Sequence, residues 1–471
     1  MPLFGTNGVR GKLDALTPAL AFDLAASFGN WCSTAGARPA PGRLADSIAL
    51  AQDMRLTSPM LSSSVRAGLL AAGKDVLDLG ICSSPVAEFA LHQNKCSGLI
   101  IVTASHNAPE WNALKFVDEK GVAVSSERGA AIEKAAVGKS YKQVAYDKVG
   151  KIIEKKDAVE EHAKAAIAAL DSSKVRKRKL RIALDFGNGT SSLSSSLFPS
   201  LGCEVIALNE KMDGTFPGRP SEPSDANVKG LIAAVKKNSC DLGVAWDGDS
   251  DRVVFVDEKG NWIVGDKGFA ISAKAACEDA SIREDGAAKG KKERYVITTV
   301  ATSRVVEEAC SPYGAKTIYT KVGAPYLSEK MLELGSSAVS GGEEVGGIIW
   351  PTFSLAKDGI YAAAKMCEMV CDKKMSELVK GLPVYYNSKL RLEAPPEKKA
   401  AGLSAAKKHA EGMGGKLLLV DGVRVDFDDG WAIVRASGTE NVMRIFAEGK
   451  TQKRAEALMK EMADSVKSAV G

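Results

Sequence analysis

One pattern recurs three times along the chain and constrains the fold more than any other feature of the sequence. Each copy pairs an early predicted strand with a second predicted strand, about 40 to 60 residues later, that ends in a polar or glycine-rich turn. The pairs are DSIALAQDMR with SGLIIVTASHN, LRIALDFGNG with DLGVAWDGDSDR, and RYVITTVATS with SSAVSGGEEVGG. The economical explanation is three diverged copies of one α/β domain, with chance similarity among α/β segments as the alternative.

The rest of the chain fits the same fold class. Stretches rich in Ala, Leu and Lys separate the short β-branched runs, which indicates α/β units with buried, mostly parallel strands. Near the C-terminus, the turn at Asp421-Gly422 predicts an antiparallel hairpin, and a helix is expected from Gln452 to Val470. We therefore predict an α/β chain with four domains around a central cleft: three repeated mixed-sheet domains at 1–148, 149–257 and 258–380, and an α+β domain at 381–471.

Composition excludes several classes of protein. The net charge of +5 is small for 471 residues, and the basic runs at 174–179 and 289–292 lack interleaved aromatic residues, so we expect solvated linkers there and no nucleic-acid partner. The nine cysteines include no C-x-x-C pair, which favours a reduced, cytoplasmic location over a disulfide framework or a zinc ribbon. Because no secretion signal and no run of about 18 apolar residues is found, we expect no membrane association.

The first polar turn, from Thr103 to Asn107, interrupts an apolar run. In open parallel sheets, ligands bind outside the carboxyl ends of strands, so chemistry is expected at such a turn. The residues alone leave two interpretations open. Either Ser105 or Asn107 caps the next helix, or the turn presents a hydroxyl group to a ligand.

The second turn, DGDSDR, indicates a metal site. Asp247, Asp249 and Asp251 alternate directly after an apolar run, and three converging carboxylates require a hard cation such as Mg²⁺ or Ca²⁺. A calcium loop would place Glu258 at its twelfth position, but Arg252 stands where that loop needs glycine, and a strand is predicted where its helix should begin. A solvated acidic turn is the other alternative.

Two further loops carry groups that suit a sugar phosphate. The turn GGEEVGG at 341–347 lets backbone approach a ligand closely and offers two carboxylates, which suit sugar hydroxyls better than phosphate. In the last domain, RASGTENVMR combines two guanidinium groups, two hydroxyls and loop amides. Such a combination suits a phosphate, although a simple ST-turn is possible there.

Taken together and in this order, the loops resemble those of the α-D-phosphohexomutase superfamily. The resemblance covers nearly the whole chain: it begins with FGTNGVRG at 4–11 and continues through TASHNAPEWNALKF, DGTFPGRPSEP at 213–223, DGDSDR, GGEEVGG and RASGTENVMR. It implies an isomerase that moves a phosphoryl group between the 1- and 6-positions of a hexose phosphate, through a phosphoserine enzyme and a bisphosphate intermediate.

The resemblance also implies roles for individual residues. Ser105 would carry the phosphate and, with Asp247, Asp249 and Asp251, hold one Mg²⁺ per chain. Lys115 is the implied proton-transfer partner of the attacking hydroxyl, although anionic surroundings favour its charged form. The other implied residues form three groups, which are Arg10, His106 and Arg252 for catalysis; Gly342, Glu343, Val345 and Lys321 for the sugar; and Arg435, Ser437, Gly438, Thr439 and Arg444 for the phosphate that is not reacting.

Departures from the family pattern leave the sugar open. Ala108 and Asn441 replace prolines that are usual there, and Val345 stands where Ser or Asn is frequent. The motifs most resemble those of archaeal-type phosphoglucosamine mutases, with phosphomannomutase/phosphoglucomutase as the alternative. Hexose phosphates are the expected partners, a hexose 1,6-bisphosphate the expected activator, and a monomer or homodimer the expected state. Hypotheses of another class are a metal-dependent sugar phosphatase and a non-catalytic sugar-phosphate binding protein.

Overall fold

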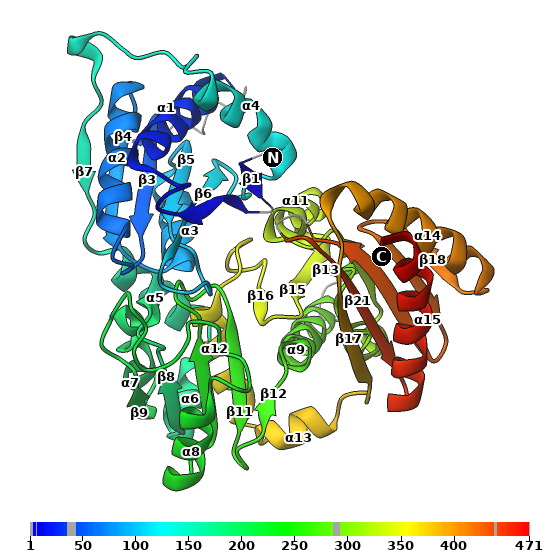
Figure 1. Ribbon diagram of the computed structural model, residues 1–471. Helices are drawn as coiled ribbons and strands as arrows, with labels where there is room; N and C mark the ends of the chain where they lie inside the picture. The colour runs from blue at the N-terminus through cyan, green and yellow to red at the C-terminus, as the bar shows by residue number, and fades with distance from the viewer. Residues whose placement is uncertain (1–2, 6, 35–43, 286–292, 438–439, 471) are drawn as a thin grey trace.

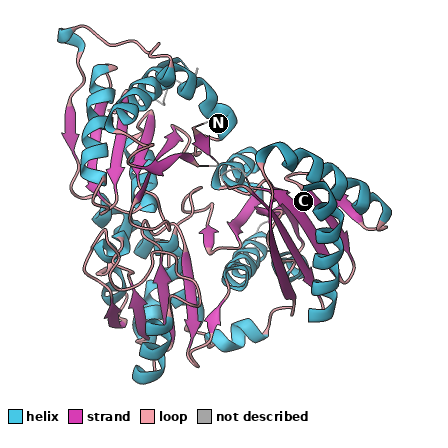
Figure 2. Cartoon of the chain, viewed as in Figure 1, coloured by secondary structure: helices cyan, strands magenta, loops and turns pink. Residues whose placement is uncertain are grey.

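The computed structural model describes residues 3–5, 7–34, 44–285, 293–437 and 440–470 and arranges them as four sheets covered by helices (Figure 1). Figure 2 shows the sheets as separate groups of strands with helices alongside. Three of the sheets share one core of four strands. The first two strands are parallel neighbours, the third runs parallel to the first on its other side, and the fourth returns antiparallel beside the third. The predicted threefold repeat of mixed sheets is confirmed.

The first sheet, with its helices, forms domain I. Its strands are Phe4–Gly5 (β1), Gly8–Lys12 (β2), Ser47–Gln52 (β3), Asp75–Ile81 (β4), Gly98–Val102 (β5), Trp111–Asp118 (β6) and Ile152–Glu154 (β7), in the order β1-β2-β6-β5-β3-β4-β7. Its helices are Pro18–Thr34 (α1), Ser58–Ala71 (α2), Ser84–Asn94 (α3) and Ser126–Val137 (α4). Ile100 and Val102 pack with side chains of α1 and α2, whereas Leu99 and Ile101 pack with those of α3. Because alternate residues of a strand face opposite sides, this double cover explains the uninterrupted apolar run.

The second sheet forms domain II. Its strands are Arg181–Asp185 (β8), Glu204–Leu208 (β9), Leu242–Trp246 (β10), Val253–Asp257 (β11) and Trp262–Ile263 (β12), in the order β12-β11-β10-β8-β9. Its helices are Ala158–Ala168 (α5), Ser172–Arg178 (α6), Leu197–Ser200 (α7) and Lys229–Asn238 (α8). The basic run at 174–179 was expected to be a linker, and this prediction is wrong for residues 174–178. These residues belong to α6, which Asp171 caps and Val175 anchors in the core.

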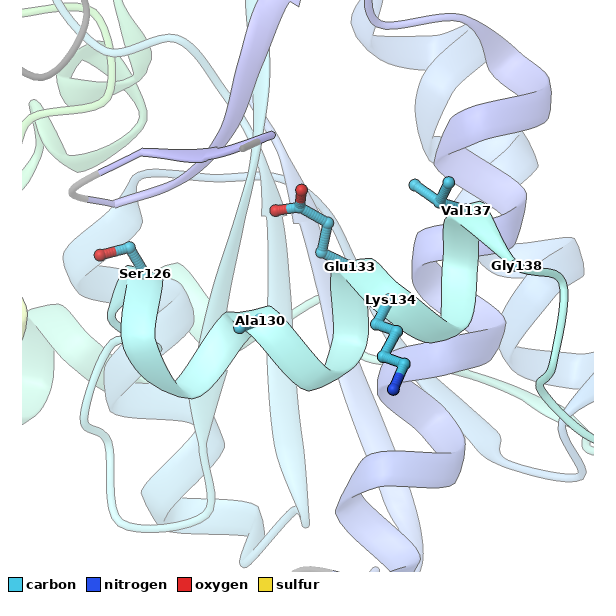
Figure 3. Close-up of a pocket in the computed structure, with 6 residues that line it drawn as sticks. All are labelled: Ser126, Ala130, Glu133, Lys134, Val137 and Gly138. Atoms are coloured by element: carbon cyan, nitrogen blue, oxygen red, sulfur yellow. The ribbon is translucent and has the colours of Figure 1, made fainter. Parts of the chain in front are cut away.

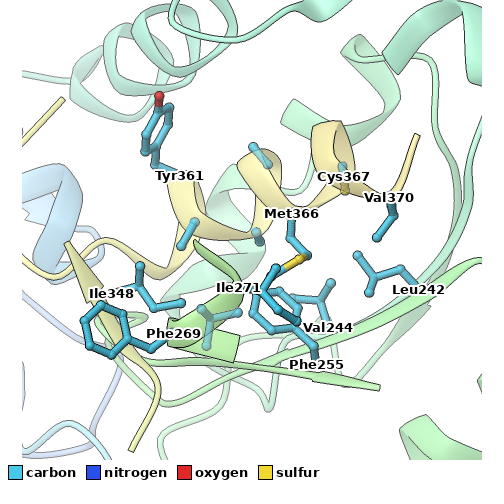
Figure 4. Packing of buried hydrophobic residues seen from close by; sticks show 14 of the residues in the cluster. Leu242, Val244, Phe255, Phe269, Ile271, Ile348, Tyr361, Met366, Cys367 and Val370 are labelled. Atoms are coloured by element: carbon cyan, nitrogen blue, oxygen red, sulfur yellow. The ribbon is translucent and has the colours of Figure 1, made fainter. Parts of the chain in front are cut away.

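The third sheet forms domain III and shares a core with domain II. Its strands are Arg294–Thr299 (β13), Ala315–Thr320 (β14), Ala338–Glu343 (β15) and Gly347–Ile349 (β16), in the order β14-β13-β15-β16. Its helices are Gly265–Asp285 (α9), Val305–Cys310 (α10), Ala324–Leu334 (α11), Gly359–Val370 (α12) and Met375–Lys380 (α13). Figure 4 shows Leu242 and Val244 of β10 packed beside Met366 of α12 and Ile271 of α9. The two repeats therefore pack as one hydrophobic unit.

The fourth sheet forms domain IV and is antiparallel throughout. Its strands are Tyr386–Glu393 (β17), Lys416–Leu418 (β18), Val423–Phe427 (β19), Gly430–Ala436 (β20) and Val442–Gly449 (β21), in the order β17-β21-β20-β19-β18, and its helices are Lys399–Gly412 (α14) and Gln452–Val470 (α15). The predicted hairpin at Asp421-Gly422 and the terminal helix are confirmed. Short 3-10 helices elsewhere span Tyr146–Lys148, Thr190–Ser194, Ser311–Tyr313, Gly335–Ser337 and Pro396–Lys398.

Domain IV packs against the strand ends of domain III. Trp431 and Ile433 of β20 enclose Val300, which follows β13. The buried guanidinium of Arg424 lies between the rings of Trp431 and Tyr319, 4.1 and 4.6 Å from their centroids, and donates to the carbonyl of Val300 at 2.7 Å. A desolvated cation between two aromatic faces is a strong contact, so this junction is well packed.

The three polar turns occupy equivalent places in the repeats. Each connects the third strand to the antiparallel fourth strand: β5 to β6, β10 to β11, and β15 to β16. Among the described residues, no helix is long and apolar enough to cross a membrane.

Candidate active site

Ser105 lies in a turn whose shape is held by buried polar contacts. Its backbone has φ of 53°, and its amide donates to Thr103 Oγ1 at 3.0 Å. The guanidinium of Arg55 donates to the carbonyls of Ser105 and Asn107 at 2.8 and 2.7 Å. The turn leads into β6 at Trp111, so the helix-capping interpretation of Ser105 is wrong. These contacts hold the residue in the left-handed region, which a non-glycine residue adopts only when its surroundings fix it.

Three buried carboxylates of domain II face this hydroxyl. Oxygen atoms of Asp247, Asp249 and Asp251 lie within 4.8 Å of one another, and Ser105 Oγ donates to Asp247 Oδ2 at 2.6 Å. Burial and the two neighbouring carboxylates raise the pKa of Asp247 well above its usual value. The strand β11 begins directly after the turn, which excludes the helix that a calcium loop would need.

A loop of domain II ties the two turns together. Ser221 belongs to the DGTFPGRPSEP segment, and its hydroxyl donates to the carbonyl of Ser105 at 3.0 Å. The same hydroxyl accepts from the amide of Gly248 in the aspartate turn, also at 3.0 Å. The sequence identified this segment only as one of the family motifs and predicted no contact for it, because no sequence pattern shows that residues 105 and 248 are neighbours in space.

Buried cations balance the carboxylates. Lys115 Nζ lies 2.5 Å from Asp249 Oδ2 and 3.4 Å from Asp251 Oδ2. Burial opposes the charge of Lys115, but the two carboxylates outweigh it and raise the pKa of the ammonium. Burial likewise opposes ionisation of Asp251, yet Lys357, Lys115 and Arg252 hold its pKa below the usual range.

Lys357 is a site residue that sequence reasoning missed. Its ammonium lies 2.6 Å from Glu343 Oε1 at the end of β15 and 3.2 Å from Asp251 Oδ2 in the turn after β10. Both carboxylates outweigh the burial of Lys357 and raise its pKa. The only local signal was a lysine directly before Asp358-Gly359 at the start of α12.

The structure brings the other predicted catalytic residues to the same turns. Arg10 Nη1 donates to Asn107 Oδ1 at 2.5 Å, and Arg252 donates its backbone amide to Asp247 Oδ1 at 3.2 Å. His106 Nδ1 lies 3.4 Å from Ser105 Oγ. Burial, followed by the charges of Arg252 and Arg10, lowers the pKa of His106 to about 2, so its imidazole is neutral at pH 7.

The predicted sugar residues divide between two places. Glu343 is buried against Lys357, and the carbonyl of Gly342 accepts from Thr298 Oγ1 at 2.9 Å. Val345 lies half-buried in the turn between β15 and β16. Lys321 is different, because its ammonium binds Glu127 of α4 at 3.1 Å, across the border between domains III and I.

The predicted phosphate residues belong to domain IV. Their described polar contacts do not include Ser105 or the aspartates at 247, 249 and 251. Arg435 Nη2 and Nε donate to Asp421 Oδ2 at 2.7 and 3.1 Å, and that oxygen also accepts from the amide of Val322 in domain III at 3.0 Å. Arg444 Nη2 lies 2.5 Å from Glu440 Oε2, and the amide of Glu440 donates to Ser437 Oγ at 3.1 Å. Gly438 and Thr439 lie outside the described residues.

A cavity of about 470 Å³ lies elsewhere, along α4 (Figure 3). Its lining residues belong to that helix, including Ser126, Glu133 and Lys134, and to Gly138 directly after it. One carboxyl oxygen of Glu133 already accepts from the amide of Phe4 at 3.0 Å. None of the residues singled out from the sequence lines this cavity.

Four family models match consecutive parts of the chain. They describe phosphoglucomutase/phosphomannomutase alpha/beta/alpha domain I at residues 1–142, domain II at 160–260, domain III at 265–386, and the C-terminal domain at 390–465. Similar sequences carry related names. A phosphoglucomutase/phosphomannomutase of Thermococcus kodakarensis is 36% identical over 96% of both chains, and a probable phosphoglucosamine mutase of Methanosarcina acetivorans is 37% identical over 98% of this chain and 99% of that one.

Solved structures share the fold. A phosphoglucomutase/phosphomannomutase family protein from Burkholderia thailandensis superposes with a TM-score of 0.85 at 24% identity, covering 99% of this chain and 97% of the other. The N-acetylphosphoglucosamine mutase of Aspergillus fumigatus, solved with GlcNAc-6P and magnesium, superposes with a TM-score of 0.61 at 15% identity over 100% and 96% of the two chains.

Proposed function

The chain belongs to the phosphoglucomutase/phosphomannomutase family, and we propose that it is a phosphohexomutase that interconverts glucosamine 6-phosphate and glucosamine 1-phosphate. One contact carries the proposal, the hydrogen bond from the hydroxyl of Ser105 to Asp247 at 2.6 Å. It sets the hydroxyl of one domain against three buried carboxylates of the next. The choice of sugar rests on the relatives named phosphoglucosamine mutase, and phosphomannomutase/phosphoglucomutase is the second candidate because the Thermococcus kodakarensis protein carries that name.

The aspartate turn suits one Mg²⁺ ion per chain. Asp249 Oδ1 and Asp251 Oδ1 are buried oxygens without hydrogen-bond partners in the described chain, and three carboxylates converge there. Asp247, Asp249 and Asp251 would hold the ion together with a phosphate on Ser105, since hard cations prefer oxygen ligands. When bound, the ion supplies positive charge that neutralises the transferring phosphoryl group.

The proposed cycle has two phosphoryl transfers. In the first, the bond between Ser105 Oγ and phosphorus breaks while the free hydroxyl oxygen of the hexose monophosphate bonds to phosphorus, which yields a hexose 1,6-bisphosphate. The proton that the sugar hydroxyl loses is balanced by the proton that Ser105 Oγ gains. The bisphosphate turns over, and Ser105 Oγ then accepts the other phosphoryl group. Added bisphosphate acts as an activator because it phosphorylates resting Ser105.

The cations around Ser105 supply most of the catalysis in this proposal. Phosphoryl transfer depends on positioning and electrostatic stabilisation, which Arg10, Lys115 and Arg252 provide. Because the pKa of Lys115 is raised, its ammonium is charged in the resting site. Lys115 can therefore accept the proton of the sugar hydroxyl only after it has given its own proton to the departing Ser105 Oγ. Neutral His106 accepts hydrogen bonds beside the serine.

The sugar and its second phosphate are held by the other two loops. Gly342, Glu343 and Val345 contact hydroxyls that are common to both orientations of the sugar, and Lys321 exchanges Glu127 for the ligand. The phosphate displaces carboxylates from the guanidinium groups, and its proposed partners are Arg435, Ser437, Gly438, Thr439 and Arg444. Hexose phosphates of the cytoplasm are the proposed partners, a location that suits nine free thiols.

The test is ³¹P NMR of the purified protein with Mg²⁺ and a trace of hexose 1,6-bisphosphate, given glucosamine 6-phosphate and mannose 6-phosphate in parallel. We expect a 1-phosphate resonance that grows faster from glucosamine 6-phosphate and is absent with Ser105→Ala. Faster growth from mannose 6-phosphate would favour the second candidate. Inorganic phosphate as the only product, undiminished in Ser105→Ala, would indicate a phosphatase, and no product at all would indicate a binding protein.

A further inference from the structure

A fully buried histidine joins three domains just behind the active site. His162 of α5 has an exposed side-chain fraction of 0%, and its Nε2 lies 2.7 Å from Asp358 Oδ2. Its ring packs edge-on against Phe89 of domain I and Phe353 of domain III, with centroids 5.4 and 5.5 Å away. Its Nδ1 is buried without a hydrogen-bond partner in the described chain. Because leaving both buried ring nitrogens without partners would cost more free energy, the bond between Nε2 and Asp358 fixes the orientation of the ring.

Asp358 is the point where this contact reaches the site. One of its carboxylate oxygens binds His162, and the other accepts from the amide of Tyr361 at 2.8 Å, which caps α12. Its own amide donates to the carbonyl of Ile348 in β16 at 3.0 Å. The preceding residue is Lys357, which contacts Glu343 and Asp251.

The residue that follows Asp358 touches the aspartate turn directly. The amide of Gly359 donates to the carbonyl of Ser250 at 3.1 Å, and its carbonyl accepts from Trp246 Nε1 at 2.8 Å. A Cβ atom on Gly359 would lie 2.7 Å from the carbonyl oxygen of Ser250, so the two backbones are in close contact. A shift of Asp358 would therefore move both of its chain neighbours, Lys357 with its ammonium and Gly359 with its contact to the turn at 247–251.

We propose that His162 is a positioning residue for the phosphoryl-transfer site: through Asp358 it sets Lys357 and the 247–251 turn in register with the rest of the site. The inference rests on the proposed function for its kinetic consequence, but its geometric consequence, a correctly shaped metal-binding turn, is independent of turnover. Partners behind a metal site commonly change metal affinity or activity by about 10- to 100-fold when they are removed.

The experiment compares three variants of the full chain with Mg²⁺. His162→Leu removes the donor to Asp358, His162→Gln offers an amide donor at a similar reach, and His409→Gln is the control at a partly exposed position of α14 in domain IV. We expect His162→Leu to lower kcat by about 10- to 100-fold with KM changed less than about threefold, and His162→Gln to recover most of that loss. His162→Phe, which keeps an aromatic ring beside Phe89 and Phe353 but has no group to bond Asp358, serves if His162→Leu does not fold, with the same expected loss.

The second readout is Mn²⁺ binding followed by electron paramagnetic resonance, which needs no turnover. We expect the dissociation constant of Mn²⁺ to rise about tenfold in His162→Leu and to stay within about threefold of wild type in His162→Gln. If the folded His162→Leu protein keeps kcat and Mn²⁺ affinity within twofold of wild type, the positioning role is overturned and the histidine only fills the core. If wild type itself lacks mutase activity, the proposed function fails, and the Mn²⁺ measurement still decides this inference.

Discussion

Arg55 is the buried side chain on which the shape of the Ser105 turn depends. Its guanidinium donates to four backbone carbonyls between residues 105 and 111, and its Nε pairs with Asp53 at 3.0 Å. Neither side chain of this pair is exposed. Lysine has a single ammonium and cannot reproduce a planar fork of donors, so it would leave buried carbonyls unsatisfied.

We therefore expect Arg55→Lys to lower kcat about 100-fold, because misplacing a reacting group by about 1 Å has an effect of that size. The free energy of unfolding should fall as well, by about 3 kcal/mol. Steady-state kinetics and chemical denaturation check the two effects. Arg66→Lys is the matched control, since Arg66 pairs with Asp78 in the same domain at a partly exposed position, and it should leave kcat unchanged. Wild-type kcat in Arg55→Lys would contradict this account of the turn.

At this scale, the sequence predicted residues that sit inside contiguous motifs and missed those that reach the site from elsewhere. Ser105 and the three aspartates are recognisable because each lies within a short contiguous motif, TASHN for Ser105 and DGDSDR for the aspartates. Lys357, His162 and Ser221 contact the site through tertiary packing, which no local pattern reveals. The roles assigned to individual residues stay predictions.

Among the elements, the turn between β15 and β16 depends on one glycine. Gly346 has φ of 91°, and its carbonyl accepts from the amide of Val253 in β11 at 3.0 Å. A Cβ atom there would lie 2.4 Å from the carbonyl oxygen of Val253. A side chain at this position would push the turn between β15 and β16 away from domain II, because backbone atoms cannot yield as a flexible side chain can.

Gly346→Ala should raise KM for the hexose phosphate about tenfold or more, through displacement of Glu343 and its neighbours, with backbone strain of about 1–3 kcal/mol. Gly314→Ala is a close control: its φ of 71° imposes a similar backbone strain, but a Cβ atom there would meet nothing within 4 Å. KM is measured for both variants. Equal KM values in the two would show that strain alone, and not the contact with Val253, matters.

The sequence predicted the repeated elements better than their connections. Apolar runs identified β5 and β10 because helices cover both faces of these strands, whereas β15, with the sequence AVSGGE, was recognised only from the repeated pattern. The prediction of mixed sheets with mostly parallel strands is confirmed, but the sequence did not show that β6, β11 and β16 each return antiparallel beside the third strand of their repeat. The run of basic residues in α6 was misjudged because its single buried residue, Val175, gives little periodicity.

On the scale of the whole molecule, the junction between domains III and IV contains buried carboxyl groups. Asp266 of α9 accepts from the amide of Ser303 at 2.9 Å. Burial, with the charges of Glu344 and Glu448 adding to it, raises the pKa of Asp266 from 3.8 to about 8. Above pH 3.8 the carboxyl group of Asp266 loses its proton in the unfolded chain but keeps it in the folded chain. The contribution of this proton to the free energy of unfolding is therefore complete at low pH and is lost as pH rises through about 8.

We expect the urea concentration at the unfolding midpoint of wild type to decrease as the pH is raised from 5 to 8.5. In Asp266→Asn, which keeps the acceptor for Ser303, the slope of this midpoint against pH should be smaller. Chemical denaturation at a series of pH values measures it. Asp464→Asn, at an exposed position of α15, is the control and should keep the wild-type dependence on pH. A slope in Asp266→Asn as steep as that of wild type would show that this carboxyl does not titrate in the junction.

The molecule also shows why the site could not be assembled from the sequence alone. The three turns come from three repeats, and they meet because domains II and III share one core and α3 of domain I begins against Asp249, where Ser84 Oγ donates to Oδ2 at 2.6 Å. Domain IV, which carries the Arg435–Arg444 segment, is held to domain III by the bond from Arg424 to the carbonyl of Val300 and by the bond from the amide of Val322 to Asp421. Such arrangements depend on packing between domains, which sequence patterns do not encode locally.

In the proposed cycle, Ser105 gives and receives the phosphoryl group, and isotopic labelling of the protein tests this step. The protein is incubated with Mg²⁺ and ³²P-labelled hexose 1,6-bisphosphate, freed of ligand, and then given unlabelled glucosamine 6-phosphate. We expect label on the peptide that contains Ser105, followed by transfer of that label to the sugar. Mutase turnover without label on Ser105, or release of the label only as inorganic phosphate, would contradict it.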